Sequence, residues 1–172
     1  KLTSNNITSL FYGHNNNLLV GTNEGLMILN LSTTEKTMLT GNSTNLKTFT
    51  NDYITNVIQD SRGLIWVGTR EGVNVLDLTT DSLNYITESE GLCNNCICGI
   101  TEDKNHNIWI TTSNGVCRVV VQRIGKDGLC ENMVKQIDDA LTARELIKVH
   151  VLENSGFEIR DAAAEMADAT DS

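Results

Sequence analysis

One sequence pattern recurs three times in the first 118 residues, and it restricts the possible folds more than any other feature. NLLVGTNEGLMILNL at 17–31 aligns with LIWVGTREGVNVLDL at 64–78 and with IWITTSNGVCRV at 108–119. A similar apolar segment precedes each copy, and these segments are ITSLFYG from Ile7, ITNVIQD from Ile54 and ICGITED from Ile97. The chain therefore repeats a unit of about 40–45 residues.

Each copy has the composition of short antiparallel strands joined by tight turns. Apolar and β-branched runs flank turn residues such as Asp60-Ser61-Arg62-Gly63. Gly25, Gly72 and Gly115 recur at one turn, where a positive φ is expected. This period, with several strands per unit, is typical of a β-propeller blade. We therefore predict a mainly β fold with three propeller-type blades, each an antiparallel four-stranded sheet, at about 1–47, 48–91 and 92–118.

The second copy, DSRGLIWVGTREG, resembles the repeat of the two-component regulator propeller family. The family pattern is close to D-x-x-G-x-I/L-W-x-G-T-x-x-G. The first copy has Leu19 in place of the tryptophan, and the third has Thr111 in place of the glycine of the G-T dipeptide. The resemblance covers 1–118 and implies part of a sensor for signal transduction on the outer side of a membrane. The resemblance also implies that such a sensor recognises an oligosaccharide or a related nutrient.

Three blades are too few to close a ring, because closed propellers have typically four to eight. An isolated arc of three leaves sheet faces uncovered at both ends. We therefore expect an incomplete propeller, which is a fragment, self-associates or folds incompletely. Among possible partners of the open arc, we expect a second copy of the same chain.

Candidate ligand contacts in the repeats come from a polar position at the recurring turn. Asn23, Arg70 and Ser113 occupy it, one in each copy, and we predict that they form a ligand-binding propeller face. Trp66 and Trp109 suggest stacking on a sugar, but they align with Leu19. That alignment favours packing between blades for both tryptophans.

The composition changes abruptly near residue 119. Residues 1–118 contain no alanine and eighteen asparagines, whereas 119–172 contain seven alanines and two asparagines. Alanine is ordinarily among the commonest residues, so this change indicates either a domain boundary or a join between unrelated sequences.

The later segment follows a different structural pattern. Val119-Val120-Val121 is a short β-branched run, and Ile147, Val149 and Val151 alternate like a strand. Apolar residues at helical spacing lie between these strands and again after them, which predicts the order β-loop-α-β-α. The loop Gly125-Lys126-Asp127-Gly128 is either an ordinary turn or a backbone cradle for phosphate, with Lys126 and Arg123 as cations.

QRIGKDGLCENMVKQIDDALTARELIKVHV resembles the YhbY-type RNA-binding family, also called the CRM domain. Its motifs V-x-x-G-K-x-G-L, V-x-x-x-I-x-x-A-L and E-L-I-K-V-x-V occur in order within 119–172. The resemblance implies a truncated KH-like α/β segment that binds RNA or a pre-ribosomal particle. It implies an RNA-contacting loop formed by Gly125, Lys126, Asp127 and Gly128. Two further basic residues, Arg144 and Lys148, also match the family pattern.

The two resemblances imply different compartments, since the sensor propeller is periplasmic or extracellular and the RNA-binding module is cytoplasmic. We therefore predict a chimera or fusion of 1–118 with 119–172. Two functions stay open: ligand recognition by the propeller, and RNA binding by the GKDG loop. The net charge of −9 disfavours broad electrostatic attraction to nucleic acid or to anionic membranes.

Other classes of function are disfavoured. The apolar runs are much shorter than the ~20 residues that span a bilayer, so we expect no membrane contact within this segment. No nucleophile motif is present and Asp138 and Asp139 are helical neighbours that point apart, so we expect no enzyme. Cys93, Cys96 and Cys98 lack a second ligand pair, which favours free thiols over a metal cluster or a local disulfide. We expect no cofactor.

Overall fold

The computed structural model describes residues 4–41, 48–124, 134–135, 138–139, 146–151, 164 and 167–169. The chain divides into two compact units. The first contains Lys1–Asp103 and Trp109–Cys117, and the second contains Lys104–Ile108 and Arg118–Ser172.

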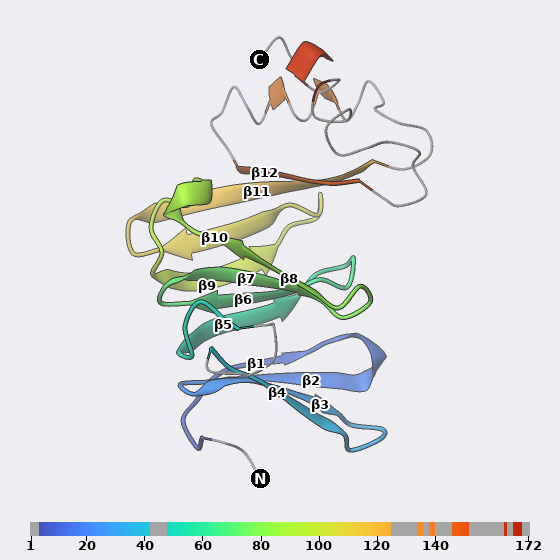
Figure 1. Ribbon diagram of the computed structural model, residues 1–172, viewed down its shortest axis with the longest axis vertical. Helices are drawn as coiled ribbons and strands as arrows, with labels where there is room; N and C mark the ends of the chain where they lie inside the picture. The colour runs from blue at the N-terminus through green and yellow to red at the C-terminus, as the bar shows by residue number, and fades with distance from the viewer. Residues whose placement is uncertain are drawn as a thin grey trace. The chain divides into compact units, whose positions relative to one another are not determined.

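The first two repeats form separate four-stranded sheets in which every neighbouring pair is antiparallel (Figure 1). The first sheet contains β1 (Ile7–Tyr12), β2 (Asn17–Thr22), β3 (Gly25–Asn30) and β4 (Lys36–Leu39). The second contains β5 (Ile54–Gln59), β6 (Ile65–Thr69), β7 (Gly72–Asp77) and β8 (Ser82–Ile86). Two 3-10 turns, η1 (His14–Asn16) and η2 (Glu88–Glu90), connect strands. The predicted mainly β architecture of antiparallel four-stranded sheets is confirmed.

The third sheet departs from the prediction in its fourth strand. Its order is β12-β11-β10-β9, from β9 (Ile97–Glu102), β10 (Ile108–Thr112), β11 (Gly115–Ile124) and β12 (Leu146–Val151). β12 pairs with β11 in parallel, with Val119 opposite Leu146 and Ile124 opposite Val151. Parallel partners need a crossover of a dozen or more residues, and the chain between β11 and β12 is long enough for one.

Strand β11 passes without interruption through the composition break. The sequence predicted a short strand at Val119-Val120-Val121, whereas β11 runs from Gly115 to Ile124. The predicted KH-like α/β segment is not confirmed. Within 125–172 the structure describes β12 and helical backbone at 134–135, 138–139, 164 and 167–169.

A local hydrogen-bond pattern explains the recurring Thr-x-x-Gly turn. Thr22, Thr69 and Thr112 each donate a hydroxyl hydrogen bond to the carbonyl of the glycine three residues later, at 2.9, 2.8 and 3.1 Å. Each hydroxyl also accepts from the amide two residues on. Those glycines have φ of +118°, +117° and +122°, which side chains rarely adopt. The turn is therefore specified within four residues.

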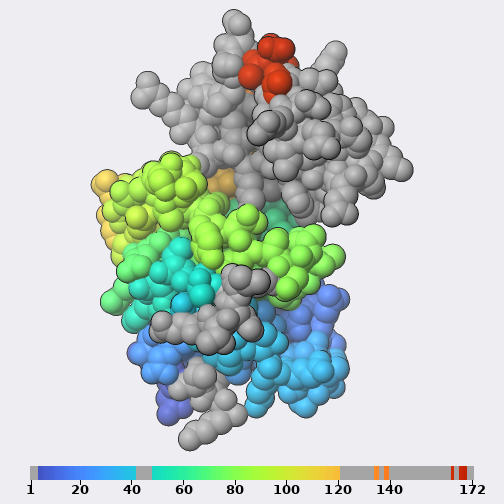
Figure 2. Space-filling model, in the orientation of Figure 1, coloured from blue at the N-terminus to red at the C-terminus, as the bar shows by residue number. Residues whose placement is uncertain are grey.

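The first strands of the three sheets are neighbours within the first unit, because β1 lies against β5 and β5 lies against β9. On the face shown in Figure 2, the first sheet in blue adjoins the second in teal and green. An apolar cluster fills the space between these two sheets. Its buried members are Leu19, Leu26, Ile28, Phe49, Ile54, Val57, Ile65, Val67 and Leu76.

Polar contacts between successive repeats follow the repeat. The amide of Val57 donates to Ser9 Oγ, and the amide of Ile100 donates to Asn56 Oδ1, both at 3.0 Å. Ser9 and Asn56 are equivalent in the alignment, as are Val57 and Ile100. Each sheet is therefore hydrogen-bonded to the next by the same contact as well as packed against it.

Candidate functional site

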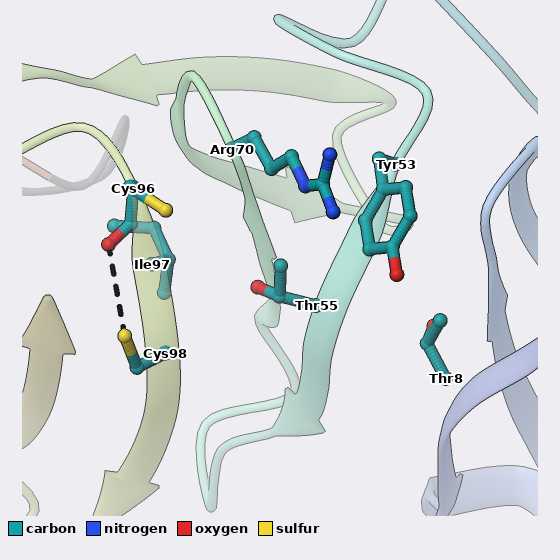
Figure 3. A pocket seen from close by; sticks show the side chains of 7 residues that line it. All are labelled: Thr8, Tyr53, Thr55, Arg70, Cys96, Ile97 and Cys98. Carbon is teal, nitrogen blue, oxygen red and sulfur yellow. Dashed lines mark hydrogen bonds between the residues drawn. The ribbon is translucent and has the colours of Figure 1, made fainter. Parts of the chain in front are cut away.

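A cavity of about 420 Å³ opens where the first strands of the three sheets meet (Figure 3). Thr8 comes from β1, Thr55 from β5, and Ile97 and Cys98 from β9. Tyr53 and Cys96 lie just before β5 and β9, and Arg70 lies in the turn between β6 and β7. Thr8, Thr55 and Cys98 are equivalent positions of the three repeats. One repeat position therefore supplies three of the seven lining residues.

Local backbone irregularity places the two threonines of this row. The pairing of β1 with β2 shifts register between Ile7 and Ser9, and that of β5 with β6 shifts between Ile54 and Asn56. Thr8 and Thr55 are the residues skipped by the pairing. Bulges of this kind often re-aim a side chain beside a binding or active site.

The hydroxyls of both threonines are buried and lack hydrogen-bond partners within the described part of the protein. Among the described residues, Thr8 Oγ1 and Thr55 Oγ1 are the buried side-chain oxygen or nitrogen atoms that have no hydrogen-bond partner. Leaving a buried hydroxyl unsatisfied costs about 1–3 kcal/mol. Both threonines line the same cavity, so its wall contains two hydroxyls that are not already used by the protein.

A cation and an aromatic ring form the polar side of the cavity. The guanidinium carbon of Arg70 lies 3.8 Å from the centre of the Tyr53 ring, and Figure 3 shows it beside that ring. Arg70 is exposed, and Tyr53 is half-buried. Stacking of this kind holds a guanidinium in place and leaves its N–H groups able to donate hydrogen bonds.

The structure places the three predicted ligand-face residues at equivalent turns but in different surroundings. Arg70 lines the cavity. Asn23 accepts a hydrogen bond from Ser4 Oγ at 2.6 Å through Oδ1. Ser113 is exposed, and its amide donates to the Cys96 carbonyl at 3.0 Å. A shared binding role for Asn23, Arg70 and Ser113 stays a prediction.

The sequence analysis did not single out Thr8, Tyr53 or Thr55. Thr8 and Thr55 follow the isoleucines that begin ITSLFYG and ITNVIQD, so a signal was present in the repeat alignment. Nothing in the alignment distinguishes an orphaned hydroxyl from a bonded one, since Thr22 and Thr69 also recur. The distinction depends on the register shift and on the neighbouring sheet.

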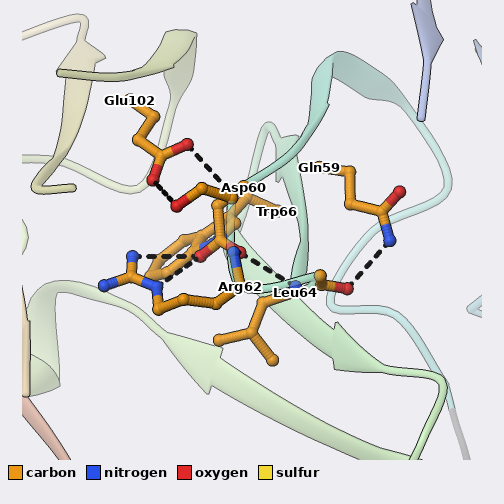
Figure 4. Close-up of polar contacts among 8 residues, drawn as sticks. Gln59, Asp60, Arg62, Leu64, Trp66 and Glu102 are labelled. Atoms are coloured by element: carbon orange, nitrogen blue, oxygen red, sulfur yellow. Dashed lines mark hydrogen bonds and ion pairs between the residues drawn. The ribbon is translucent and has the colours of Figure 1, made fainter. Parts of the chain in front are cut away.

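The D-x-x-G-x-I-W motif has a structural role in the second sheet (Figure 4). Asp60 is fully buried and accepts hydrogen bonds from the Arg62 and Leu64 amides, from the Arg62 guanidinium and from Trp66 Nε1, at 2.9–3.1 Å. Trp66 is also fully buried. In the third repeat Trp109 Nε1 donates to Asp103 at 2.8 Å, but Trp109 is 36% exposed. The motif couples its aspartate to its tryptophan.

The residues predicted to contact RNA are mostly outside the described part of the chain. The loop Gly125, Lys126, Asp127 and Gly128, as well as Arg144, lies outside the described residues. Arg123 lies in β11 and Lys148 in β12, and Lys148 pairs with Val121. The RNA-contacting role of all seven residues, Arg123 included, stays a prediction.

The described residues contain neither a metal-binding cluster nor a membrane-spanning helix. No group of three or more histidine, cysteine, aspartate or glutamate side chains is positioned there to hold a metal ion. No helix in the same residues is long and apolar enough to cross a membrane.

Comparison with protein families identifies two different ones on adjoining stretches. Residues 48–71 and 91–114 match the two component regulator propeller model, and residues 114–172 match the CRS1 / YhbY (CRM) domain model. Both resemblances predicted from the sequence are confirmed. The two matched stretches meet at residue 114, in the turn before β11.

Two of the solved structures similar to this chain are extracellular sensor domains. The extracellular domain of the hybrid two component system BT3049 from B. thetaiotaomicron is 25% identical, with a TM-score of 0.60 over 69% of this chain. The corresponding domain of BT4673 from the same organism is 27% identical, with a TM-score of 0.54 over 67% of this chain. This chain spans only 16% of each of those structures.

The later segment has a curated relative. YqeI of Bacillus subtilis (strain 168), whose name describes an RNA-binding protein, is 54% identical over 41 residues. That stretch is 24% of this chain and 43% of YqeI, so this chain spans less than half of the relative.

Proposed function

We propose that the repeats of this chain are a ligand-recognising part of a sensor propeller, and that they bind without catalysing a reaction. The ligand is a small hydroxyl-rich molecule such as an oligosaccharide, held in the cavity between β1, β5 and β9. The pair of orphaned hydroxyls on Thr8 and Thr55 is the observation that supports this assignment most directly. The similarity to extracellular sensor domains supports a periplasmic or extracellular location for such a part.

The residues of the cavity divide the recognition between them. The two threonine hydroxyls would exchange hydrogen bonds with ligand hydroxyls, which removes the cost of leaving them unpaired. Arg70 would bind a ligand oxygen while stacked on Tyr53, and an anionic group would be bound more strongly than a neutral one. A ligand with several hydroxyls and a carboxylate suits this set of groups better than an apolar one.

Calorimetric titration with neutral and uronic-acid-containing disaccharides tests the proposal. We expect measurable binding by at least one member of the panel, and binding about 2–10-fold weaker for Thr55→Val, the effect of one lost hydrogen bond. Arg70→Gln should weaken binding of acidic members more than of neutral ones. Thr37→Val and Lys36→Gln are matched controls on exposed positions of β4 and should bind like the parent protein. Equal affinity of Thr55→Val and the parent would contradict the assignment of the cavity.

A second function, RNA binding by the later segment, is supported by the CRM match and by the identity to YqeI. In this proposal the GKDG loop at Gly125–Gly128 clamps the RNA backbone, and Lys126 supplies the cation. Because phosphate contacts release counterions, affinity should fall steeply as salt rises. We expect Lys126→Ala to weaken binding to single-stranded RNA at low salt and Lys36→Ala to have no effect. Absence of binding by the parent protein at low salt would end this proposal.

We propose further that the two segments are joined from unrelated proteins, whose compartments would be extracellular and cytoplasmic. The two family matches that meet at residue 114 support this. Intact-mass measurement with peptide mapping across Arg118–Ile124 checks that the join is a peptide bond in one chain. Detection of two shorter chains would contradict it.

A further inference from the structure

Two cysteines that are 24 residues apart in sequence lie next to each other in the third repeat. The amide of Cys93 donates a hydrogen bond to Cys117 Sγ at 3.0 Å. The amide nitrogen of Cys93 is bonded directly to the Cα of Cys93, and the sulfur of Cys117 lies two bonds from the Cα of Cys117. The contact therefore places the two Cα atoms near the separation of about 4.4–6.8 Å that disulfides bridge.

The side chain of Cys93 also lies over the strand that carries Cys117. A Cβ on Gly115 would lie 3.6 Å from Cys93 Cβ and 3.7 Å from Cys93 Sγ. Gly115 and Cys117 are two residues apart in β11, so they face the same side of that strand. Rotation about the Cα–Cβ bond of Cys93 is the motion that would bring its sulfur to Cys117.

The two thiols differ in access to reagents. Cys93 is exposed and Cys117 is buried, and both are free in the structure. Burial, and after it the hydrogen bond shared with the Cys93 side chain, raises the pKa of the Cys117 thiol to about 11. An external reagent therefore reaches Cys93 first, and Cys117 reacts only with a partner already held beside it.

We propose that Cys93 and Cys117 form a disulfide bond in an oxidising environment, by exchange with a small disulfide such as oxidised glutathione. The Cys93 thiolate attacks one sulfur of the reagent, and the other leaves as a thiolate. Cys117 then loses its proton to solvent and attacks Cys93 Sγ, so the second half of the reagent also leaves as a thiol. The reagent gains the two electrons that the two cysteines lose.

The bond would fasten one wall of the cavity. Asn95 and Cys96 lie two and three residues after Cys93, and their carbonyls accept from the Gly72 amide at 2.8 Å and from the Ser113 amide at 3.0 Å. Cys96 lines the cavity itself. A link from Cys93 to β11 would restrain this segment. The inference does not depend on any ligand binding there.

The test incubates the whole chain with oxidised glutathione and then blocks the remaining thiols. Trypsin should release residues 71–104 joined to residues 105–118 by a disulfide, as detected by mass spectrometry without reduction. The fragment 71–104 also contains Cys96 and Cys98, so the experiment is repeated with Cys96→Ser, Cys98→Ser and Cys130→Ser combined. The linked pair should persist in that variant and be absent from Cys93→Ser and Cys117→Ser. Serine at 117 keeps an acceptor for the Cys93 amide, which protects the fold of the control.

Thermal unfolding provides a second measurement. We expect oxidation to raise the Tm by roughly 5–10 °C, because the link restricts the unfolded chain, and dithiothreitol to reverse the rise. Cys93→Ser and Cys117→Ser should show no such rise. Loss of the linked peptides in the triple variant, or persistence of the link in Cys93→Ser, would overturn the pairing.

Discussion

Gly68 of β6 lies so close to Ile97 of β9 that no side chain fits between them. A Cβ on Gly68 would come within 2.6 Å of Ile97 Cγ2 and 3.2 Å of Ile97 Cβ. The preceding repeat has the same relationship, because a Cβ on Gly21 would come within 2.7 Å of Ile54 Cγ2. The glycine of the G-T dipeptide therefore serves the approach of the next repeat's first strand.

This relationship explains why the third repeat departs from the family pattern. Thr111 takes the position of Gly21 and Gly68, and it is exposed, with its hydroxyl donating to the Gly99 carbonyl at 3.3 Å. Gly99 in turn takes the position of Ser9 and Asn56. The side chains of those two residues accept a hydrogen bond from a backbone amide of the next repeat. The third repeat thus lacks both features that receive a following strand in the first two.

Gly68→Ala should destabilise the protein by about 1–3 kcal/mol, the cost of overpacking against the β-branched Ile97. Thr111→Ala, at the equivalent exposed position, should change the free energy of unfolding by less than about 0.5 kcal/mol. Urea unfolding monitored by the fluorescence of Trp66 and Trp109 measures both free energies. Equal effects of the two substitutions would show that the strand approach does not depend on the glycine.

Two threonine-to-valine substitutions should have opposite effects on stability. Thr55→Val removes a buried hydroxyl without a partner, so the protein should gain about 1 kcal/mol. Thr69→Val removes a fully buried hydroxyl bonded to the Gly72 carbonyl, the Glu71 amide and the Thr50 hydroxyl, and should cost about 1–3 kcal/mol. Denaturant midpoints of the two variants decide the matter. Destabilisation by Thr55→Val would mean that its hydroxyl is already satisfied.

Asp60→Asn should destabilise the protein by about 3 kcal/mol, because it removes a fully buried charge that pairs with Arg62 at 3.0 Å. Asp103→Asn should cost less, since its partner Trp109 is 36% exposed whereas Trp66 is fully buried. Thermal unfolding of both variants at neutral pH measures the difference. A cost at Asp103 as large as that at Asp60 would contradict the role assigned to burial.

The thiol of Cys117 should make the reduced protein sensitive to alkaline pH. Its pKa in the folded chain, about 11, lies above the ordinary value of 9.0, because burial disfavours the thiolate. Its stabilising contribution is therefore complete below pH 9 and lost as pH rises from about 9 to about 11. Cys117→Ser should lose less stability than the parent over that range in urea titrations with reductant. Iodoacetamide should modify Cys93 before Cys117 at pH 8, and the reverse order would contradict this assignment.

The exposed side of β1 should promote self-association of the isolated chain. Leu10 and Tyr12 are 62% and 61% exposed, whereas Val57, which aligns with Leu10, is 2% exposed beneath the preceding repeat. Burial of such apolar surface favours association. Light scattering should show a mass above that of one chain, lowered by Leu10→Asp and unchanged by Leu31→Asp in an exposed turn. A single-chain mass at high concentration would contradict the expectation.

The sequence analysis reached the repeats more easily than the later segment. Strand pattern and turn chemistry predicted the sheets because hydroxyls such as that of Thr69 are satisfied by groups within three residues. The parallel pairing of β12 with β11 was missed, because alternation at Ile147, Val149 and Val151 indicates a strand but names no partner. Arg70 was singled out by its place in the repeat, whereas Thr8 and Thr55 became visible only through the register shift of their strands.

The amino-acid sequence alone determined the repeating strands, the Thr-x-x-Gly turns and the change of family near residue 114. Each of these features depends on residues that are only a few positions apart. The tertiary structure alone decided the cavity, the closeness of Cys93 to Cys117 and the space above Gly68. These features join strands from different repeats or from opposite ends of one repeat. Their geometry depends on how whole sheets pack against each other, and local residue preference does not encode it.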